Sequence, residues 1–372
     1  MSSVDVIVPC YRYGHFLREC VESVLAQSGP SVRILIIDDA SPDNTADVAS
    51  DLAREDSRVN FSRHTCNKGH IDTYNEGIEW ASADYILILS ADDNLLPGAL
   101  SRAATLMDAH LEVGFTFGKA IALDDGGAAR QTIGITVTED SHILTGLEFM
   151  ELSGARNIVP TATAVVRTQL QKRVGGYRHE LPHSGDMEMW LRLAAHASVG
   201  ILGSAQAVYR RHADNMSRAY WKEGSLPDLQ QGKAALDCFF QTCSSALPNA
   251  QQLQRRLFWL LGCDAVARAS GAFNEGKIEV SERLSQFALH ICPEINRSLP
   301  WTKLAYKRRL GPRTWSALRP VVTGIRAVPV FLSNMISKYL SLRNHAAIAR
   351  QIRLYSLFRR ALRLSQNTDG YW

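Results

Sequence analysis

Short apolar runs alternate with amphipathic segments through the first 120 residues. The runs predict buried strands, which lie at residues 4–9, 32–38, 59–62, 85–89 and 113–117. The segments between them repeat apolar residues at helical spacing and predict helices, which lie at 15–27, from Ser41 onward, 69–81 and 97–110. Strands that alternate with helices are typical of βαβ units, so the pattern predicts an α/β fold with a mostly parallel sheet.

The pattern becomes purely helical after residue 217. Three further helices are expected, at 229–246, 251–269 and 278–290. We therefore expect an α/β domain over 1–218, a helical extension over 219–294 and a basic, amphipathic helical tail over 295–372.

The tail carries a strong charge asymmetry. Fifteen of the 41 Lys and Arg residues, and no Asp or Glu, lie between Ile295 and Thr368, which leaves 26 basic against 37 acidic residues elsewhere. Such a tail either packs on its own acidic body or on a second copy in a homodimer, or it docks on an anionic surface. Nucleic acid is not expected as a partner, because no recognised binding module accompanies the charge.

The remaining bulk features favour a cytoplasmic protein. No stretch of 18 uncharged apolar residues is present, and the first residues lead directly into a strand without a basic region and apolar core of a signal peptide. The seven cysteines are scattered and include no C-x-x-C pair, which is typical of reduced thiols.

Two adjacent carboxylates, Asp92 and Asp93, follow the apolar run 85–89. Open α/β folds bind ligands at the carboxyl ends of their strands. Paired carboxylates there favour a divalent cation such as Mg²⁺ or Mn²⁺, which usually holds substrate phosphates. Taken alone, the pair is equally consistent with the start of the helix at 97–110.

Three other strand ends carry polar residues, at Pro9–Tyr11, Asp38–Ser41 and Asn67–Gly69. Because parallel strands end at one edge of a sheet, these residues and Asp92–Asp93 are expected to form one shared site.

In these motifs the chain resembles the family 2 glycosyltransferases, inverting enzymes with a GT-A fold. Six motifs occur in the family's order: Val4–Tyr11, Ile37–Ser41, Asn67–Gly69, Leu89–Asp93, Gly185–Arg192 and Tyr209–Ser217. The resemblance covers about residues 2–218, and it depends on the order of all six, since any one alone is weak.

The resemblance implies a nucleotide site built from Pro9, Tyr11, Asp39, Lys68 and Asp92. Tyr11 would stack on the base of the donor, and Asp39 would accept a hydrogen bond from an imide N–H. A carboxylate only accepts, so it suits the N–H of uracil or thymine. Lys68 would lie near the diphosphate.

The resemblance also implies that Asp92 and Asp93 hold the ribose and a Mg²⁺ or Mn²⁺ ion, with His212 closing over the diphosphate or its metal. The ion would neutralise charge on the departing nucleoside diphosphate. Ser90 stands where the family commonly has another acid, which leaves open which aspartate is the direct metal ligand.

Asp186 aligns with the general base of the family and would take the proton of the acceptor hydroxyl. The preceding position, usually acidic, is Gly185, so no like charge there raises the pKa of Asp186. Glu188 is expected to point elsewhere if the segment is helical, and is kept only as a reserve base.

The resemblance thus implies a metal-dependent, inverting transfer of sugar from a UDP- or dTDP-type donor to a saccharide or lipid-linked acceptor, in the assembly of a cell-surface polysaccharide. The tail would place the protein peripherally on the cytoplasmic face of a membrane, where a lipid-linked acceptor resides. Two alternatives remain. Ser90 and Gly185 suggest a non-catalytic sugar-nucleotide binder, and the tail suggests a membrane-surface assembly partner.

Overall fold

The structure is a computed structural model that describes residues 2–124, 129–213, 215–216, 220 and 225–317. The chain divides into two compact units. The first comprises residues 1–220 and 227–261, and the second comprises 221–226 and the residues from 262 onward. The three-part division expected from the sequence stays a prediction.

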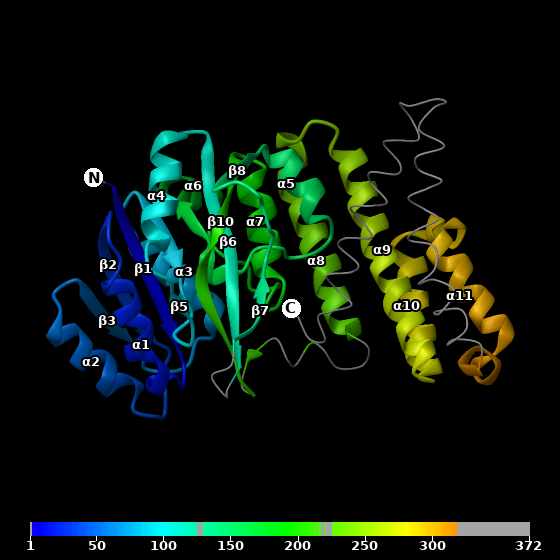
Figure 1. The fold of residues 1–372 in the computed structure, drawn as a ribbon, viewed down its shortest axis with the longest axis horizontal. Helices are drawn as coiled ribbons and strands as arrows, with labels where there is room; N and C mark the ends of the chain where they lie inside the picture. The colour runs from blue at the N-terminus through cyan, green and yellow to red at the C-terminus, as the bar shows by residue number, and fades with distance from the viewer. Residues whose placement is uncertain (1, 125–128, 214, 217–219, 221–224, 318–372) are drawn as a thin grey trace. The chain divides into compact units, whose positions relative to one another are not determined.

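The first unit contains one mixed sheet, whose strands follow the order β3-β2-β1-β4-β9-β6-β10-β5, with β7 paired to β6 and β8 to β10 (Figure 1). The strands are β1 (Ser3–Cys10), β2 (Ser31–Asp38), β3 (Val59–Arg63), β4 (Tyr85–Ile88), β5 (Asn94–Leu95), β6 (Val113–Asp124), β7 (Ala129–Ile133), β8 (Ser141–Leu144), β9 (Val165–Arg167) and β10 (Ser198–Arg211). Strands β1 to β4 run parallel to one another, as do β6 and β10, whereas β5, β7, β8 and β9 pair antiparallel.

Helices cover both faces of this sheet. The helices of the first unit, including α9, whose last part enters the second unit, are α1 (Gly14–Leu25), α2 (Thr45–Glu55), α3 (His70–Trp80), α4 (Ala99–Ala109), α5 (Gly146–Ser153), α6 (Thr168–Val174), α7 (Gly185–Ala194), α8 (Leu226–Cys243) and α9 (Ala250–Asn274). The buried side chains of α1, α2 and α4 belong to one core cluster with β1 and β2. Helix α3 packs on the other face of β1, and α5 and α7 lie with it on that side, against the aromatic residues of β6.

The alternation of side chains along β1 explains this layering. Val4, Val6 and Val8 point into the cluster that α1 and α4 cover, whereas Ile7 faces α3. A Cβ atom on Gly77 of α3 would lie 2.3 Å from Cγ2 of Ile7, so glycine is required for the helix to approach the strand this closely.

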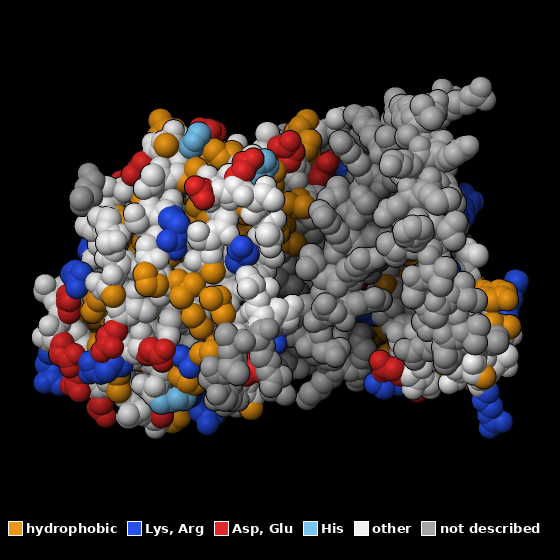
Figure 2. Space-filling model, viewed as in Figure 1, with side chains coloured by type: hydrophobic (Ala, Val, Ile, Leu, Met, Phe, Trp, Pro, Cys, Tyr) orange, Lys and Arg blue, Asp and Glu red, His pale blue; other side chains and the backbone are white. Residues whose placement is uncertain are grey.

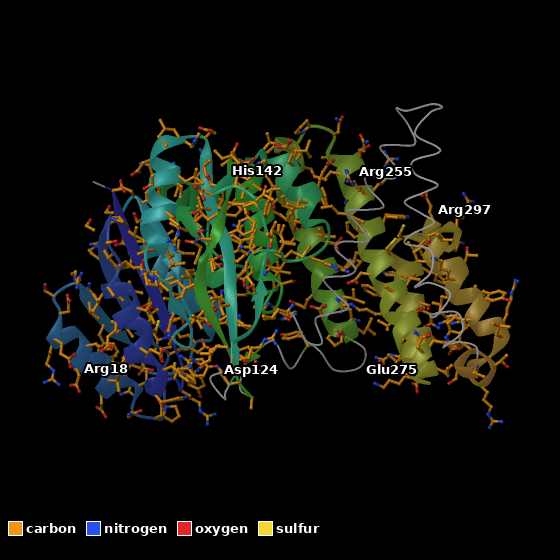
Figure 3. All side chains as sticks on the ribbon, in the orientation of Figure 1. Arg18, Asp124, His142, Arg255, Glu275 and Arg297 are labelled. Carbon is orange, nitrogen blue, oxygen red and sulfur yellow. The ribbon has the colours of Figure 1, made fainter. Side chains whose placement is uncertain are left out.

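The carboxyl ends of β1, β2, β4 and β10 lie along the same edge of the sheet. Figure 3 marks that edge by Asp124, at the end of β6, and the opposite edge by His142 of β8. Near the edge marked by Asp124, acidic and basic side chains lie side by side on the surface over α1 and α2 (Figure 2). The Arg18–Glu55 ion pair joins these two helices. The order of strands reverses direction between β1 and β4, which is where open α/β folds bind ligands.

The second unit is helical where the structure describes it. Besides the end of α9 it contains α10 (Ile278–Ile291) and α11 (Leu299–Leu310). Arg308 of α11 donates to the hydroxyl groups of Ser281 and Ser285 on α10, at 3.0 and 2.9 Å. No helix in the described part of the chain is long and apolar enough to span a membrane.

The structure confirms the α/β fold and the predicted strands at β1, β2, β3, β4 and β6, together with the three later helices. Two predicted ends were too early, because β6 continues to Asp124 and α9 to Asn274. One predicted start was also wrong: α2 begins at Thr45 rather than at Ser41, because Ser41 accepts a hydrogen bond from Arg12 N and Asp43 accepts from Thr45 N. The part of the expected tail beyond residue 317 lies outside the described residues.

Candidate functional site

The loops that follow β1 and β2 are bonded to each other. Asp39 N donates to Cys10 O at 2.9 Å, and Arg12 N donates to Ser41 Oγ at 2.9 Å. Arg12 and Ala40 have positive φ angles of 64° and 56°, which are uncommon for residues with a side chain. Local strain of this kind is typical of functional sites, so the two loops are candidates for ligand contact.

The Asp39 carboxylate is buried behind these loops. Its Oδ1 accepts from Lys68 N at 2.7 Å, and its Oδ2 accepts from Gly69 N at 2.9 Å. Gly69 has a φ of 87°, which glycine adopts without strain. In this backbone conformation its N–H points to Asp39. The carboxylate therefore has a fixed orientation at the end of β2.

The ring of His64 completes the surroundings of Asp39. Its Nδ1 lies 2.7 Å from Asp39 Oδ1, and its Nε2 lies 2.9 Å from Oε2 of Glu76 on α3. The ammonium group of Lys68 lies 3.3 Å from the same Glu76 oxygen. Desolvation raises the pKa of Glu76, but hydrogen bonds from His64 and Lys68 outweigh it, so the pKa of Glu76 lies below its usual value. Glu76 is therefore ionised near neutral pH.

Two further candidates lie at the end of β1. Tyr11 is 43% exposed, so its ring is available for stacking. Pro9 is buried and pairs with Ile37 of β2. Pro9 thus shapes the strand end, whereas Tyr11 extends from it.

Asp92 and Asp93 follow β4 and are each only 5% exposed. Asp93 Oδ1 accepts from Arg210 N of β10 at 3.0 Å. Desolvation and the neighbouring charge of Asp92 raise the pKa of Asp93 well above its usual range. Two adjacent buried carboxylates therefore repel each other at this point, and positive charge would stabilise them.

His212 joins this pair to the β1 loop. Its Nε2 lies 2.9 Å from Asp92 Oδ2, and its ring centroid lies 5.3 Å from that of Tyr13 and 5.5 Å from that of Phe16. Asn215 Nδ2 also approaches Asp92 Oδ2, at 3.4 Å. Contacts therefore run continuously from the β1 and β2 loops to the ends of β10 and β4.

Asp186 lies in the first turn of α7. Thr161 Oγ1 donates to its Oδ2 at 2.7 Å, and the Tyr177 hydroxyl is a second hydrogen-bond partner. Desolvation raises the pKa of Asp186, although both hydrogen bonds act in the opposite direction. A carboxylate with a raised pKa and a fixed orientation has the properties of a general base.

Glu188 has a different role from that of its neighbour on α7. It is fully buried and bonded to Arg178 at 3.2 Å and to Arg192 at 2.8 Å. These two ion pairs direct its carboxylate away from Asp186, as the helical spacing predicted. Its burial shows that Glu188 is not a charge on the helix surface.

Tyr74 of α3 shows that three of the carboxylates share one region. Desolvation raises its pKa, and the charges of Asp186, Asp92 and Asp93 add to that effect. Tyr74 also packs edge-on against Tyr177, the partner of Asp186, with ring centroids 5.2 Å apart. The structure thus brings the ends of β1, β2, β4 and β10 together with the start of α7.

Several residues of this region were not predicted from the sequence. Their signal is spatial only, since each is distant in sequence from the group it contacts; they are His64, Tyr74, Glu76, Thr161 and Tyr177.

The residues after β4 suit a divalent cation in their chemistry. Asp92 and Asp93 offer carboxylate oxygens and His212 offers an imidazole nitrogen, and a cation would offset the repulsion between the two buried carboxylates. No three His, Cys, Asp or Glu side chains within the described ranges are arranged as a complete ligand cluster. A cation here would need oxygen ligands from a substrate as well.

Comparisons with known proteins identify the family and the fold. The model of the family described as "Glycosyl transferase family 2" matches residues 5–170. An uncharacterized protein of Mycobacterium tuberculosis, MT1568, is 30% identical over 219 residues, which are 56% of this chain and 67% of that protein.

A GalNAc(5)-diNAcBac-PP-undecaprenol beta-1,3-glucosyltransferase of Campylobacter jejuni is 30% identical over 145 residues, 38% of this chain, and the match spans less than half of that enzyme, 46%. Among solved structures, Staphylococcus aureus TarS 1–349 in complex with UDP-GlcNAc superposes with a TM-score of 0.53 at 16% identity. It covers 76% of this chain and 90% of that one, which shows a shared fold.

Proposed function

The chain belongs to glycosyl transferase family 2, and from that membership we propose that it transfers a sugar from a nucleoside-diphosphate donor to an acceptor hydroxyl. The observation that carries the proposal is the grouping of Asp92, Asp93 and Asp186 around Tyr74, at the edge where the strands end. Donor phosphates and an attacking hydroxyl have to meet within such a region.

The donor nucleotide would lie on the loops after β1 and β2. The exposed ring of Tyr11 would stack on the base, beside Pro9, and Asp39 would accept the imide N–H of uracil or thymine. Asp39 Oδ1 already accepts from both Lys68 N and His64. Oδ2 accepts from Gly69 N alone among the described residues, so it has the capacity for the base. The ammonium group of Lys68 would turn from Glu76 to the diphosphate.

A Mg²⁺ or Mn²⁺ ion would be held by Asp92, Asp93 and His212 together with the donor. Such an ion supplies positive charge to the departing diphosphate. The backbone N–H of Arg210 fixes Asp93, and the aromatic contacts of Tyr13 and Phe16 fix the ring of His212. These contacts fix two of the proposed ligands, and the donor would have to complete the set, because no complete ligand cluster is arranged among the described residues.

Asp186 would act as the general base. Its carboxylate takes the proton of the acceptor hydroxyl as that oxygen forms a bond to the anomeric carbon. The bond between that carbon and the phosphate oxygen breaks, and its electron pair leaves with the nucleoside diphosphate. The hydrogen bonds from Thr161 and Tyr177 keep the carboxylate oriented during this step. A single displacement from the opposite face inverts the anomeric configuration.

The acceptor would be a saccharide or a lipid-linked saccharide in cell-surface polysaccharide assembly. The Campylobacter relative supports this, because its name describes an undecaprenol-linked substrate. A basic tail over 295–372 would then bring the protein to an anionic membrane surface on the cytoplasmic side.

A thermal-shift screen of sugar nucleotides with and without Mn²⁺ tests the proposal. We expect one UDP- or dTDP-sugar to raise the unfolding midpoint, and Mn²⁺ to enlarge the shift. Hydrolysis of that donor should then depend on the ion. A donor that binds but is never turned over would instead identify a non-catalytic sugar-nucleotide binder, as the serine at position 90 and the glycine at 185 suggest.

A further inference from the structure

The ring of His64 is buried between two acids from different parts of the fold. Its Nδ1 lies 2.7 Å from Oδ1 of Asp39, at the end of β2, and its Nε2 lies 2.9 Å from Oε2 of Glu76, on α3. The buried ring therefore bridges the two carboxylates and fixes the position of Asp39 Oδ1 at the end of β2.

The neighbouring contacts fix the rest of this carboxylate. The backbone N–H groups of Lys68 and Gly69 donate to Asp39 Oδ1 and Oδ2, and the ammonium of Lys68 lies 3.3 Å from Glu76, the second partner of His64. The ring and the two N–H groups therefore hold Asp39 in one orientation, in which Oδ2 can accept a hydrogen bond from a ligand.

From this geometry we propose that His64 is a positioning residue that sets the base specificity of the donor site. The proposal rests on the nucleotide role of Asp39 proposed above. Uracil and thymine present a donor N–H at position 3, whereas cytosine presents an acceptor there. A carboxylate oxygen held toward position 3 of the base will bind the first two and repel the third.

The alternative is that His64 only stabilises the loop around residues 64–69. In that case its loss would weaken binding of every nucleotide equally. The ratio of the UDP and CDP dissociation constants separates the two roles, since only a change at Asp39 alters it.

Two substitutions of similar size divide the contacts of the ring. In His64→Asn the amide nitrogen takes about the position of Nδ1 and can still donate to Asp39. In His64→Gln the longer side chain reaches the position of Nε2 and contacts Glu76 instead. His64→Phe removes both contacts. His110→Phe is a matched control, because His110 pairs with Glu112 just before β6, at the opposite edge of the sheet.

The test is calorimetric titration of UDP and of CDP into the full chain with Mg²⁺, after circular dichroism has verified folding of each variant. We expect the wild type to prefer UDP. His64→Gln and His64→Phe should reduce that preference by about ten-fold or more, as expected for loss of a hydrogen bond to a charged group, while His64→Asn should retain most of it.

Wild-type preference in a folded His64→Gln protein overturns the proposal, as does an equal loss for both nucleotides. A wild type that binds neither UDP nor dTDP overturns the proposed function as well, which distinguishes the two failures. If His64→Phe does not fold, the Asn and Gln pair alone decides the outcome.

Discussion

Replacement of Asp186 by Asn tests the assigned base without changing the shape of the site. The amide is the same size as the carboxylate, and its oxygen can still accept from Thr161 Oγ1, which now lies 2.7 Å from Asp186 Oδ2. What is lost is the capacity to take a proton. General-base catalysis contributes about 10² to 10⁴ in rate, so we expect the turnover of donor to fall by that factor, equivalent to about 3–5 kcal/mol of transition-state free energy.

Donor affinity should remain unchanged in this variant. Asp186 has no contact with the Asp39 network or with the His212–Asp92 pair among the described interactions. The assay is release of UDP from a UDP-sugar at saturating concentration, beside a calorimetric titration of UDP. The wild-type rate should also rise with pH through the raised pKa of Asp186, and the variant should lack that rise. Wild-type turnover in Asp186→Asn would refute the role of this residue.

Three further substitutions test the surrounding groups. Asp93→Asn should raise the thermal unfolding midpoint at pH 7 without divalent cations. In the wild type the raised pKa of Asp93 in the folded state favours folding at low pH, and this contribution is lost as pH rises through the raised value. The stability gain of Asp93→Asn over the wild type should therefore vanish toward about pH 4, and equal midpoints at pH 7 would contradict this reasoning. Tyr11→Ala should weaken UDP binding by about 1–3 kcal/mol through lost stacking, and calorimetry that finds no change would exclude contact with the base. Glu188→Gln should lower the free energy of unfolding by about 3–5 kcal/mol in urea titrations, because it leaves Arg178 and Arg192 without their buried partner, and a neutral result would show that these pairs are not needed.

The parallel half of the fold was predictable because its strands are continuous apolar runs. Most residues of β1, β2 and β4 are buried on both faces, so each strand appears in the sequence as a largely apolar run, in which Asp5 of β1 and Arg33 of β2 are the internal charged residues. Strand β10 was missed although it is the longest strand described, because its pattern is interrupted by register shifts between Leu202 and Ala207.

The start of helix α5 could also have been predicted from the sequence. Thr145 and Glu148 form a capping box at its start, and this pattern is recognisable from the sequence. The polar strand ends predicted which loops meet, because parallel strands end at one edge. The partners of Asp39 and Asp186 could not be predicted, since His64 and Thr161 lie 25 residues away in sequence from the carboxylates they contact.

The most direct test of the central claim is proton NMR of an α-linked UDP-sugar during turnover by the wild-type protein with Mg²⁺. If Asp186 activates an acceptor oxygen opposite the diphosphate held near Asp92 and Asp93, the first sugar signal to grow must be that of the β-anomer, before mutarotation. An α-anomer that forms first would show a retained configuration and contradict the single displacement on which the account depends.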